Sequence, residues 1–208
     1  MKKTLLLAGV ASLFAMNANA VEFNPYVSAK LRYADMSSDI TLGDAITFDV
    51  EDNVMGGSVA IGTSVKTSNG NVRAELEYNK NQNAEKSFAM NFAGVVDFQG
   101  NLEVETQSVM LNGYYDIDTG SKLTPYVGAG IGLAKTEATL TGLGYSQSVD
   151  DNTFAWQVGA GVGYNVTEKI TVDAGYRYVD YGNFSNSDYD VDVETSAHEL
   201  YLGARYTF

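Results

Sequence analysis

The sequence lacks cysteine altogether and contains only two prolines and one histidine among 208 residues. Without cysteine, disulfide bonds, thiolate metal ligands and a lipid-anchored N-terminal cysteine are excluded. The single histidine and the absence of a glycine-lysine phosphate loop leave no recognisable metal or cofactor motif, so neither is expected. Basic residues are also scarce, with 13 Lys and Arg against 26 Asp and Glu. Because phosphate binding requires positive charge, no nucleic-acid partner is expected.

Long hydrophobic runs are confined to the N-terminus. Residues 1–20 combine Lys2 and Lys3, an apolar stretch from Leu5 to Met16 and the small-residue end Ala18-Asn19-Ala20, which are the three parts of a secretory signal peptide. Cleavage before Val21 would leave one domain, residues 21–208, with a net charge of −15. No later run approaches the ~20 apolar residues of a membrane-spanning helix. Such a chain can still cross a membrane as a closed β-barrel.

Apolar residues recur at every second position through most of this domain, which is the period of a β-strand. The alternation predicts eight strands, around 27–33, 59–65, 72–78, 109–115, 127–133, 154–164, 170–178 and 200–208. One face is apolar throughout, whereas the other carries glycine, serine and charge. The charged positions expected inside the barrel are Lys30, Arg32, Arg73, Glu75, Glu77, Asp173, Arg177, Glu199 and Arg205.

The connections between these strands alternate strictly in length. Long connections near 35–53, 80–102, 136–152 and 181–194 alternate with short turns near 68–70, 118–120 and 165–168. Aromatic residues cluster at the strand ends, as in the interfacial girdles of membrane barrels. The expected girdle residues are Tyr26, Tyr115, Tyr126, Tyr164, Tyr206 and Phe208 at the short-turn end, and Tyr33, Tyr78, Phe154, Trp156 and Tyr178 at the other. The pattern favours an all-β, eight-stranded antiparallel up-and-down transmembrane β-barrel over a secreted soluble β-protein.

Several segments resemble the eight-stranded outer-membrane barrels of the OmpA transmembrane-domain and opacity-protein type. These segments are Pro25-Tyr26-Val27, residues 71–78, residues 112–116, residues 125–130, Tyr176-Arg177-Tyr178 and residues 202–208. The resemblance implies a monomer in the outer membrane of a Gram-negative bacterium, in contact with outer-membrane lipid and lipopolysaccharide. It also implies that the ending with Tyr206 and Phe208 is the signal to the barrel-assembly machinery. The sequence departs from full-length OmpA in having nothing after Phe208, so no periplasmic peptidoglycan-binding domain is expected. A host or environmental ligand is expected at the extracellular loops.

An eight-stranded barrel has an interior just wide enough to be filled by side chains. Five bases and four acids are predicted there, close to the balance that buried charges require. Inward glycines at 128, 130, 132, 159, 161 and 163 would leave room for large side chains from other strands. A structural network is the favoured interpretation, and an ion or proton path is the alternative.

Beyond the aromatic girdle at the end with the long connections, the polarity of the two strand faces reverses. The outward positions become acidic and the inward positions apolar, which predicts an apolar-lined sleeve above the membrane. The expected lining is Phe48, Val50, Leu102, Val104, Leu140, Val191 and Val193. Such a sleeve would pack its own loop tips, bind or conduct small hydrophobic molecules, or bind a partner along a projecting sheet edge.

Two weaker chemical patterns lie in the last strand. Ser196 and His198, beside Glu194, share the outward face and allow the hypothesis of a lipid A-modifying enzyme. The stripe Asp188, Asp190, Asp192 and Glu194 could bind divalent cations, although it lacks the turn geometry of a dedicated site. The favoured function is a non-enzymatic surface barrel with a structural or adhesive role.

Overall fold

The computed structural model describes residues 22–42, 46–81, 84–92, 96–142, 145–186 and 191–208; side chains are described for 22–37, 53–81, 106–135, 152–182 and 195–208. The strands are β1 (Phe23–Leu42), β2 (Ile46–Thr67), β3 (Gly70–Asn81), β4 (Ala84–Phe92), β5 (Val96–Ile117), β6 (Leu123–Gly142), β7 (Tyr145–Asn165), β8 (Ile170–Asn186) and β9 (Val191–Thr207). The described residues include no helix with the length and apolarity needed to cross a membrane.

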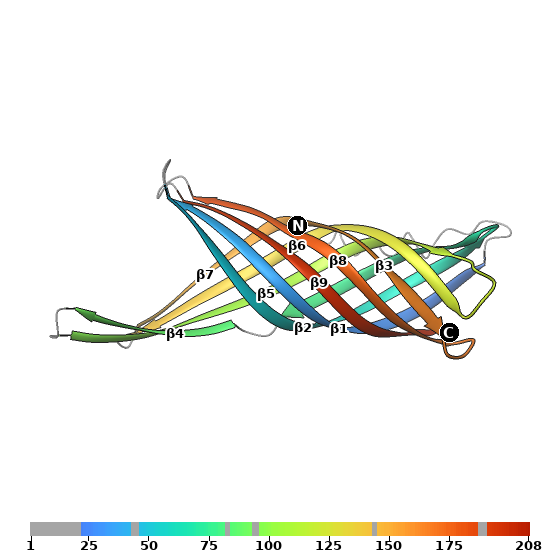
Figure 1. Cartoon of the computed structure of the whole chain (residues 1–208), viewed down its shortest axis with the longest axis horizontal. Coiled ribbons are helices and arrows are strands. Elements are labelled where there is room, and N and C mark those ends of the chain that lie inside the picture. The colour runs from blue at the N-terminus through green and yellow to red at the C-terminus, as the bar shows by residue number, and fades with distance from the viewer. Residues whose placement is uncertain (1–21, 43–45, 82–83, 93–95, 143–144, 187–190) are drawn as a thin grey trace, which may run out of the picture.

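Eight of these strands close into an antiparallel barrel. Each barrel strand pairs with its neighbours in the order β3-β2-β1-β9-β8-β7-β6-β5, and the pairing of β3 with β5 closes the cylinder. The predicted fold class is therefore confirmed. The ninth strand, β4, pairs only with the outer part of β5 and forms a hairpin that projects beyond the barrel (Figure 1). It lies in the connection near 80–102 that the sequence led us to expect as a loop.

The two faces of the barrel follow the predicted alternation. Large apolar side chains point outward, with Leu31 72% and Leu202 63% exposed. All nine predicted interior charges are buried. In water such a continuous apolar exterior would be a serious liability, whereas in a bilayer it matches the surrounding hydrocarbon.

Two of the expected girdle residues belong to the interior instead. Tyr26 and Tyr126 are 2% and 4% exposed and lie inside the barrel. The reason is their position directly before Val27 and Val127, which point outward, since consecutive side chains of a strand point to opposite faces. The girdle at the short-turn end retains the exposed side chains of Tyr115, Tyr164, Tyr206 and Phe208.

Four of the interior tyrosines each pack onto a glycine of the neighbouring strand. The paired positions are Tyr26 with Gly62, Tyr114 with Gly128, Tyr126 with Gly161, and Tyr201 with Gly175. A methyl group on any of these glycines would come within 2.2–2.5 Å of the tyrosine ring or hydroxyl. The glycines therefore leave space for rings that lie flat along the barrel wall, and their role extends beyond the two strands for which it was predicted.

Above the barrel the strands continue as two separate leaves, not as the closed sleeve expected from the sequence. The described β2–β3 ladder ends at Gly56–Asn81, and the β7–β8 ladder ends at Trp156–Asp180, where β8 also shifts register against β9. One leaf contains the outer parts of β1, β2 and β9 with the end of β8, and the other contains the outer parts of β4 to β7. The tips of the two leaves diverge in Figure 1. The side chains of the predicted lining lie outside the described residues: Phe48, Val50, Leu102, Val104, Leu140, Val191 and Val193.

Candidate functional site

The centre of the barrel is crossed by a continuous chain of ion pairs. Arg32 contacts Glu199 at 2.8 Å, and Glu199 also contacts Arg177 at 2.6 Å. Arg177 then contacts Glu77 at 3.2 Å. From Glu77 the chain continues to Lys30 at 3.2 Å, and from Lys30 to Glu75 at 2.8 Å. Six of the predicted interior charges are thus joined in one network.

Glu77 occupies the middle of this network. It extends from β3 and meets Arg177 of β8, which is the strand directly across the barrel in the closed order. Its carboxylate is fully buried and also accepts hydrogen bonds from Lys30 and from the amide of Asn112, the latter at 2.8 Å. Charge-assisted bonds of this kind are the strong ones in a dry interior. The Glu77–Arg177 pair therefore ties opposite walls together.

A second ionic cluster lies nearer the short-turn end. Arg73 contacts Asp116 at 2.8 Å, Arg205 contacts Asp173 at 3.1 Å, and Arg205 also approaches Asp116 at 3.6 Å. Asp116 is absent from the interior charges predicted from sequence, because the strand was expected to end at Tyr115. The sequence alternation does indicate its position, because Asn112, Tyr114 and Asp116 are spaced by two residues and therefore share the inward face of the strand. With Asp116 included, five bases face five acids among the described interior side chains, so the lumen is formally neutral.

Polar and aromatic side chains fill the space around these charges. The Arg73 guanidinium lies 4.4 Å from the centre of the Tyr114 ring, a cation–π distance. The Tyr26 hydroxyl donates to Glu75 at 3.0 Å, and Tyr126 and Tyr201 share a hydrogen bond. Beside Tyr114, Arg177 and Tyr201, the structure leaves a cavity of about 10 Å³, roughly the space of one water molecule.

An apolar layer covers the ionic network on the side of the long hairpins. Its members come from β1 and from β5 to β9: Ala34, Met110, Ala134, Ala155, Val179, Tyr181 and Ala197. Tyr181 connects the two layers, since its hydroxyl donates to Glu199 at 3.1 Å. The described interior therefore changes from ionic to apolar toward the long hairpins.

The two residues of the enzymatic hypothesis are placed on the outer surface of β9. The Nδ1 atom of His198 shares a 2.5 Å hydrogen bond with the Tyr176 hydroxyl, and the two rings stack. Ser196 lies opposite Asp180 in β8 and Ser37 in β1, and no hydrogen bond joins it to His198 among the described side chains. His198 is thus part of an aromatic group with Tyr176 and Tyr178. The side chains of the acidic stripe 188–194 lie outside the described residues.

The net charge of residues 21–208 is concentrated in the long hairpins, beyond the belt of outward-facing apolar side chains. The segments 35–53, 80–105, 135–152 and 180–194 contain eighteen Asp and Glu residues and three lysines. At the short-turn end, Lys66, Lys122 and Lys169 balance Glu22, Asp118 and Glu168. Because the lumen is also balanced, the −15 charge belongs to the long-hairpin end alone.

The chain resembles known proteins along its full barrel. The family model described as "Outer membrane protein beta-barrel domain" matches residues 5–208. The outer membrane protein PagN of Salmonella typhimurium is 30% identical over 190 residues, which cover 82% of this chain and 80% of PagN. The opacity protein opA68 of Neisseria gonorrhoeae is 30% identical over 154 residues, covering 69% and 62%. Neisserial surface protein A superimposes with a TM-score of 0.56 at 22% identity, covering 88% of this chain and 97% of that structure.

Proposed function

Because this chain belongs to the outer membrane protein β-barrel family, we propose that it is a closed scaffold whose long-hairpin end binds partners outside the cell. The protein is a bacterial outer-membrane surface barrel with a structural or interaction role. The finer proposal concerns where that role resides. The termini and short turns lie on the periplasmic side, and the long hairpins face the exterior.

The filled lumen is the observation that carries this proposal. A continuous ion-pair network, four tyrosines packed on glycines and an apolar layer occupy the interior. The cavity beside Arg177 has the volume of about one water molecule. Such an interior stabilises the barrel and provides no passage for solutes. The contacts that distinguish this protein are therefore assigned to the hairpins, as is usual where a rigid scaffold supports variable loops.

The charge of the hairpins indicates the chemistry of the partner. Eighteen carboxylates against three lysines create a strongly negative field, which attracts basic surfaces and repels polyanions. We therefore assign a protein partner with a basic surface. This attraction is screened beyond about 8 Å at physiological ionic strength, so attachment should weaken as salt increases.

The two alternatives have less support. A conduit for small hydrophobic molecules would need an opening through the apolar layer and the ion-pair network. A lipid A-modifying enzyme would need His198 to activate Ser196, but no hydrogen bond joins these two residues among the described side chains, and His198 instead stacks on Tyr176. A non-enzymatic role is accordingly part of the proposal.

Attachment of bacteria that display the protein tests this function. Cells without other adhesins would be compared for adherence to epithelial monolayers when they display the wild-type chain or D188N/D190N/D192N/E194Q. We expect adherence to drop several-fold with the neutralised variant and to fall with salt for the wild type, because partner attraction depends on surface charge. The control is K66Q/K122Q at the short-turn end, which should adhere like the wild type. Equal adherence of the neutralised variant at equal surface display would overturn the proposal.

A further inference from the structure

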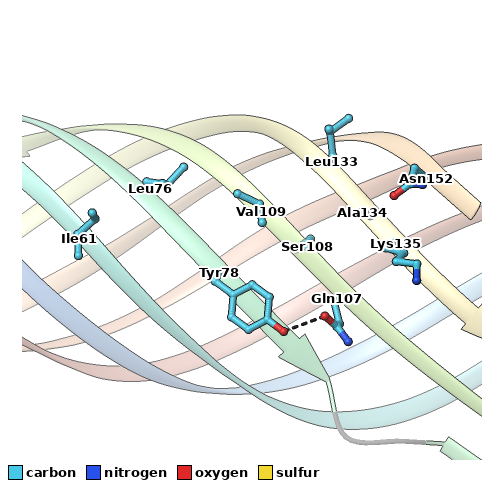
Figure 2. A pocket seen from close by; sticks show the side chains of 10 residues that line it. All are labelled: Ile61, Leu76, Tyr78, Gln107, Ser108, Val109, Leu133, Ala134, Lys135 and Asn152. Carbon is cyan, nitrogen blue, oxygen red and sulfur yellow. Dashed lines mark hydrogen bonds between the residues drawn. The ribbon is translucent and has the colours of Figure 1, made fainter. Parts of the chain in front are cut away.

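The outer wall of the barrel carries a hollow at the upper edge of its apolar belt. It has a volume of about 480 Å³ and is lined by β2, β3, β5, β6 and β7 (Figure 2). Its floor is formed by Ile61, Leu76, Val109 and Leu133, and its upper rim by Gln107, Lys135 and Asn152. All of these side chains except the polar rim belong to the face that meets hydrocarbon.

The hollow has a simple cause in the sequence. Register aligns Tyr78, Val109 and Leu133 on adjacent strands, so a small side chain stands between two larger ones. The Tyr78 hydroxyl donates to Gln107 at 2.8 Å, which holds the ring along the rim (Figure 2). A second hollow, of about 660 Å³, lies on the other side of Tyr78 and includes Leu31, Val59 and Lys80 in its lining. Tyr78 thus divides two apolar troughs, each of which has a lysine among its lining residues.

These lysines lie on one level of the wall. Register places Lys80, Gln107, Lys135 and Asn152 in a row across β3, β5, β6 and β7. The two lysines are two strands apart, or about 10 Å. Immediately below is the apolar row of Val59, Tyr78, Val109, Leu133 and Phe154. The next row above holds Glu105, Glu137 and Asp150, so the charge on these strands changes sign directly above the lysine row.

The opposite side of the barrel lacks this arrangement at the corresponding edge. There the first polar outward positions include Asp35 of β1 and Asp180 of β8. His198 lies on β9, the strand between these two. Only three lysines lie anywhere in the long-hairpin segments, and two of them belong to this row. The long-hairpin end otherwise repels anions. An anionic ligand is therefore expected to bind beside the two troughs, where these two lysines lie.

We propose that the two troughs and the lysine row bind one lipopolysaccharide molecule, with acyl chains in the troughs and lipid A phosphates at Lys80 and Lys135. The apolar floor matches the chains, and two ammonium groups at headgroup level match the phosphates. Lipopolysaccharide is favoured over a phospholipid because two separate troughs and two separate cations suit several chains and two phosphates. The inference rests on the orientation given in the proposed function, which places this edge in the outer leaflet.

Retention of lipid A by the purified protein tests the site. The wild type, K80Q/K135Q and V109W would be extracted in mild detergent with EDTA, and bound lipid A would be measured by mass spectrometry per mole of protein. EDTA removes any bridging through divalent cations. We expect retention to fall about tenfold when both lysines are neutralised, because each contributes to attraction for anionic headgroups, and to fall similarly when tryptophan fills the first trough.

The matched control is K66Q/K122Q, which removes the same charge at the short-turn end and should retain lipid A like the wild type. Heat-modifiable electrophoretic migration shows whether each variant is folded. Equal retention by folded K80Q/K135Q and wild type would overturn the proposal, as would equal competition by phosphatidylglycerol vesicles. If lipid A retention did not depend on Lys80 and Lys135, the proposed adhesive function would still stand, because the adherence experiment neutralises different residues, the acidic stripe 188–194.

Discussion

Replacing Glu77 by glutamine is expected to lower the free energy of unfolding by about 3–5 kcal/mol, the usual cost of leaving a buried charge without its partner. Glu77 is fully buried and contacts Lys30 and Arg177. Its carboxylate is the link between opposite walls of the barrel. After the substitution, one excess positive charge remains in a lumen that the five acids and five bases otherwise neutralise.

Urea unfolding of the protein refolded in lipid vesicles would measure this effect. The exposed Glu168→Gln substitution at the short-turn end is the matched control and should change stability by less than about 1 kcal/mol. A double substitution, E77Q/R177Q, restores charge balance and should be less destabilised than the sum of the two single variants. Equal stability of E77Q and wild type would contradict the role assigned to the network.

Replacing Gly128 by alanine is expected to destabilise the barrel by about 1–3 kcal/mol through overpacking. The added methyl group would lie 2.2 Å from Cδ1 of Tyr114. The ring cannot move freely, because it packs against the Arg73 guanidinium at 4.4 Å and edge-on against Tyr126 at 5.9 Å. Relief of the clash therefore disturbs the cluster that contains Asp116.

The same unfolding measurement applies, with Gly113→Ala as its control. Gly113 lies on β5 beside Tyr114, and a methyl group there would meet nothing within 4 Å. Its substitution should be neutral or slightly stabilising, because alanine restricts the unfolded chain. In a Tyr114→Ala background, the Gly128 substitution should cost much less. If both glycine substitutions had the same effect, close tyrosine packing would not be the cause.

The barrel and its charged interior could be predicted because strand alternation is a strictly local signal. Once Val27, Val72 and Val172 are assigned to the outside, the phase of Lys30, Arg73 and Asp173 follows. Asp116 followed the same rule but was missed because the strand was ended one residue too early. Tyr26 and Tyr126 were misplaced because aromatic clustering at strand ends was given more weight than their phase.

Other features depend on contacts that a single sequence does not encode locally. The pairing of Glu77 with Arg177 joins residues 100 positions apart on opposite strands. The separation into two leaves depends on where β3 ends and on the register shift between Asp180 and Asn183. The outer troughs depend on which side chains of different strands share a row, so Lys80 and Lys135 gave no signal before the register was known.

Planar-bilayer conductance of the refolded protein tests most directly the claim that the lumen is sealed and the function lies outside the barrel. The filled interior predicts no steady conductance for the wild type, with or without small hydrophobic solutes. A steady conductance that such solutes block would contradict the account. In that case the apolar layer around Met110 and Tyr181 would have to open, and the conduit would replace the scaffold as the function of the barrel.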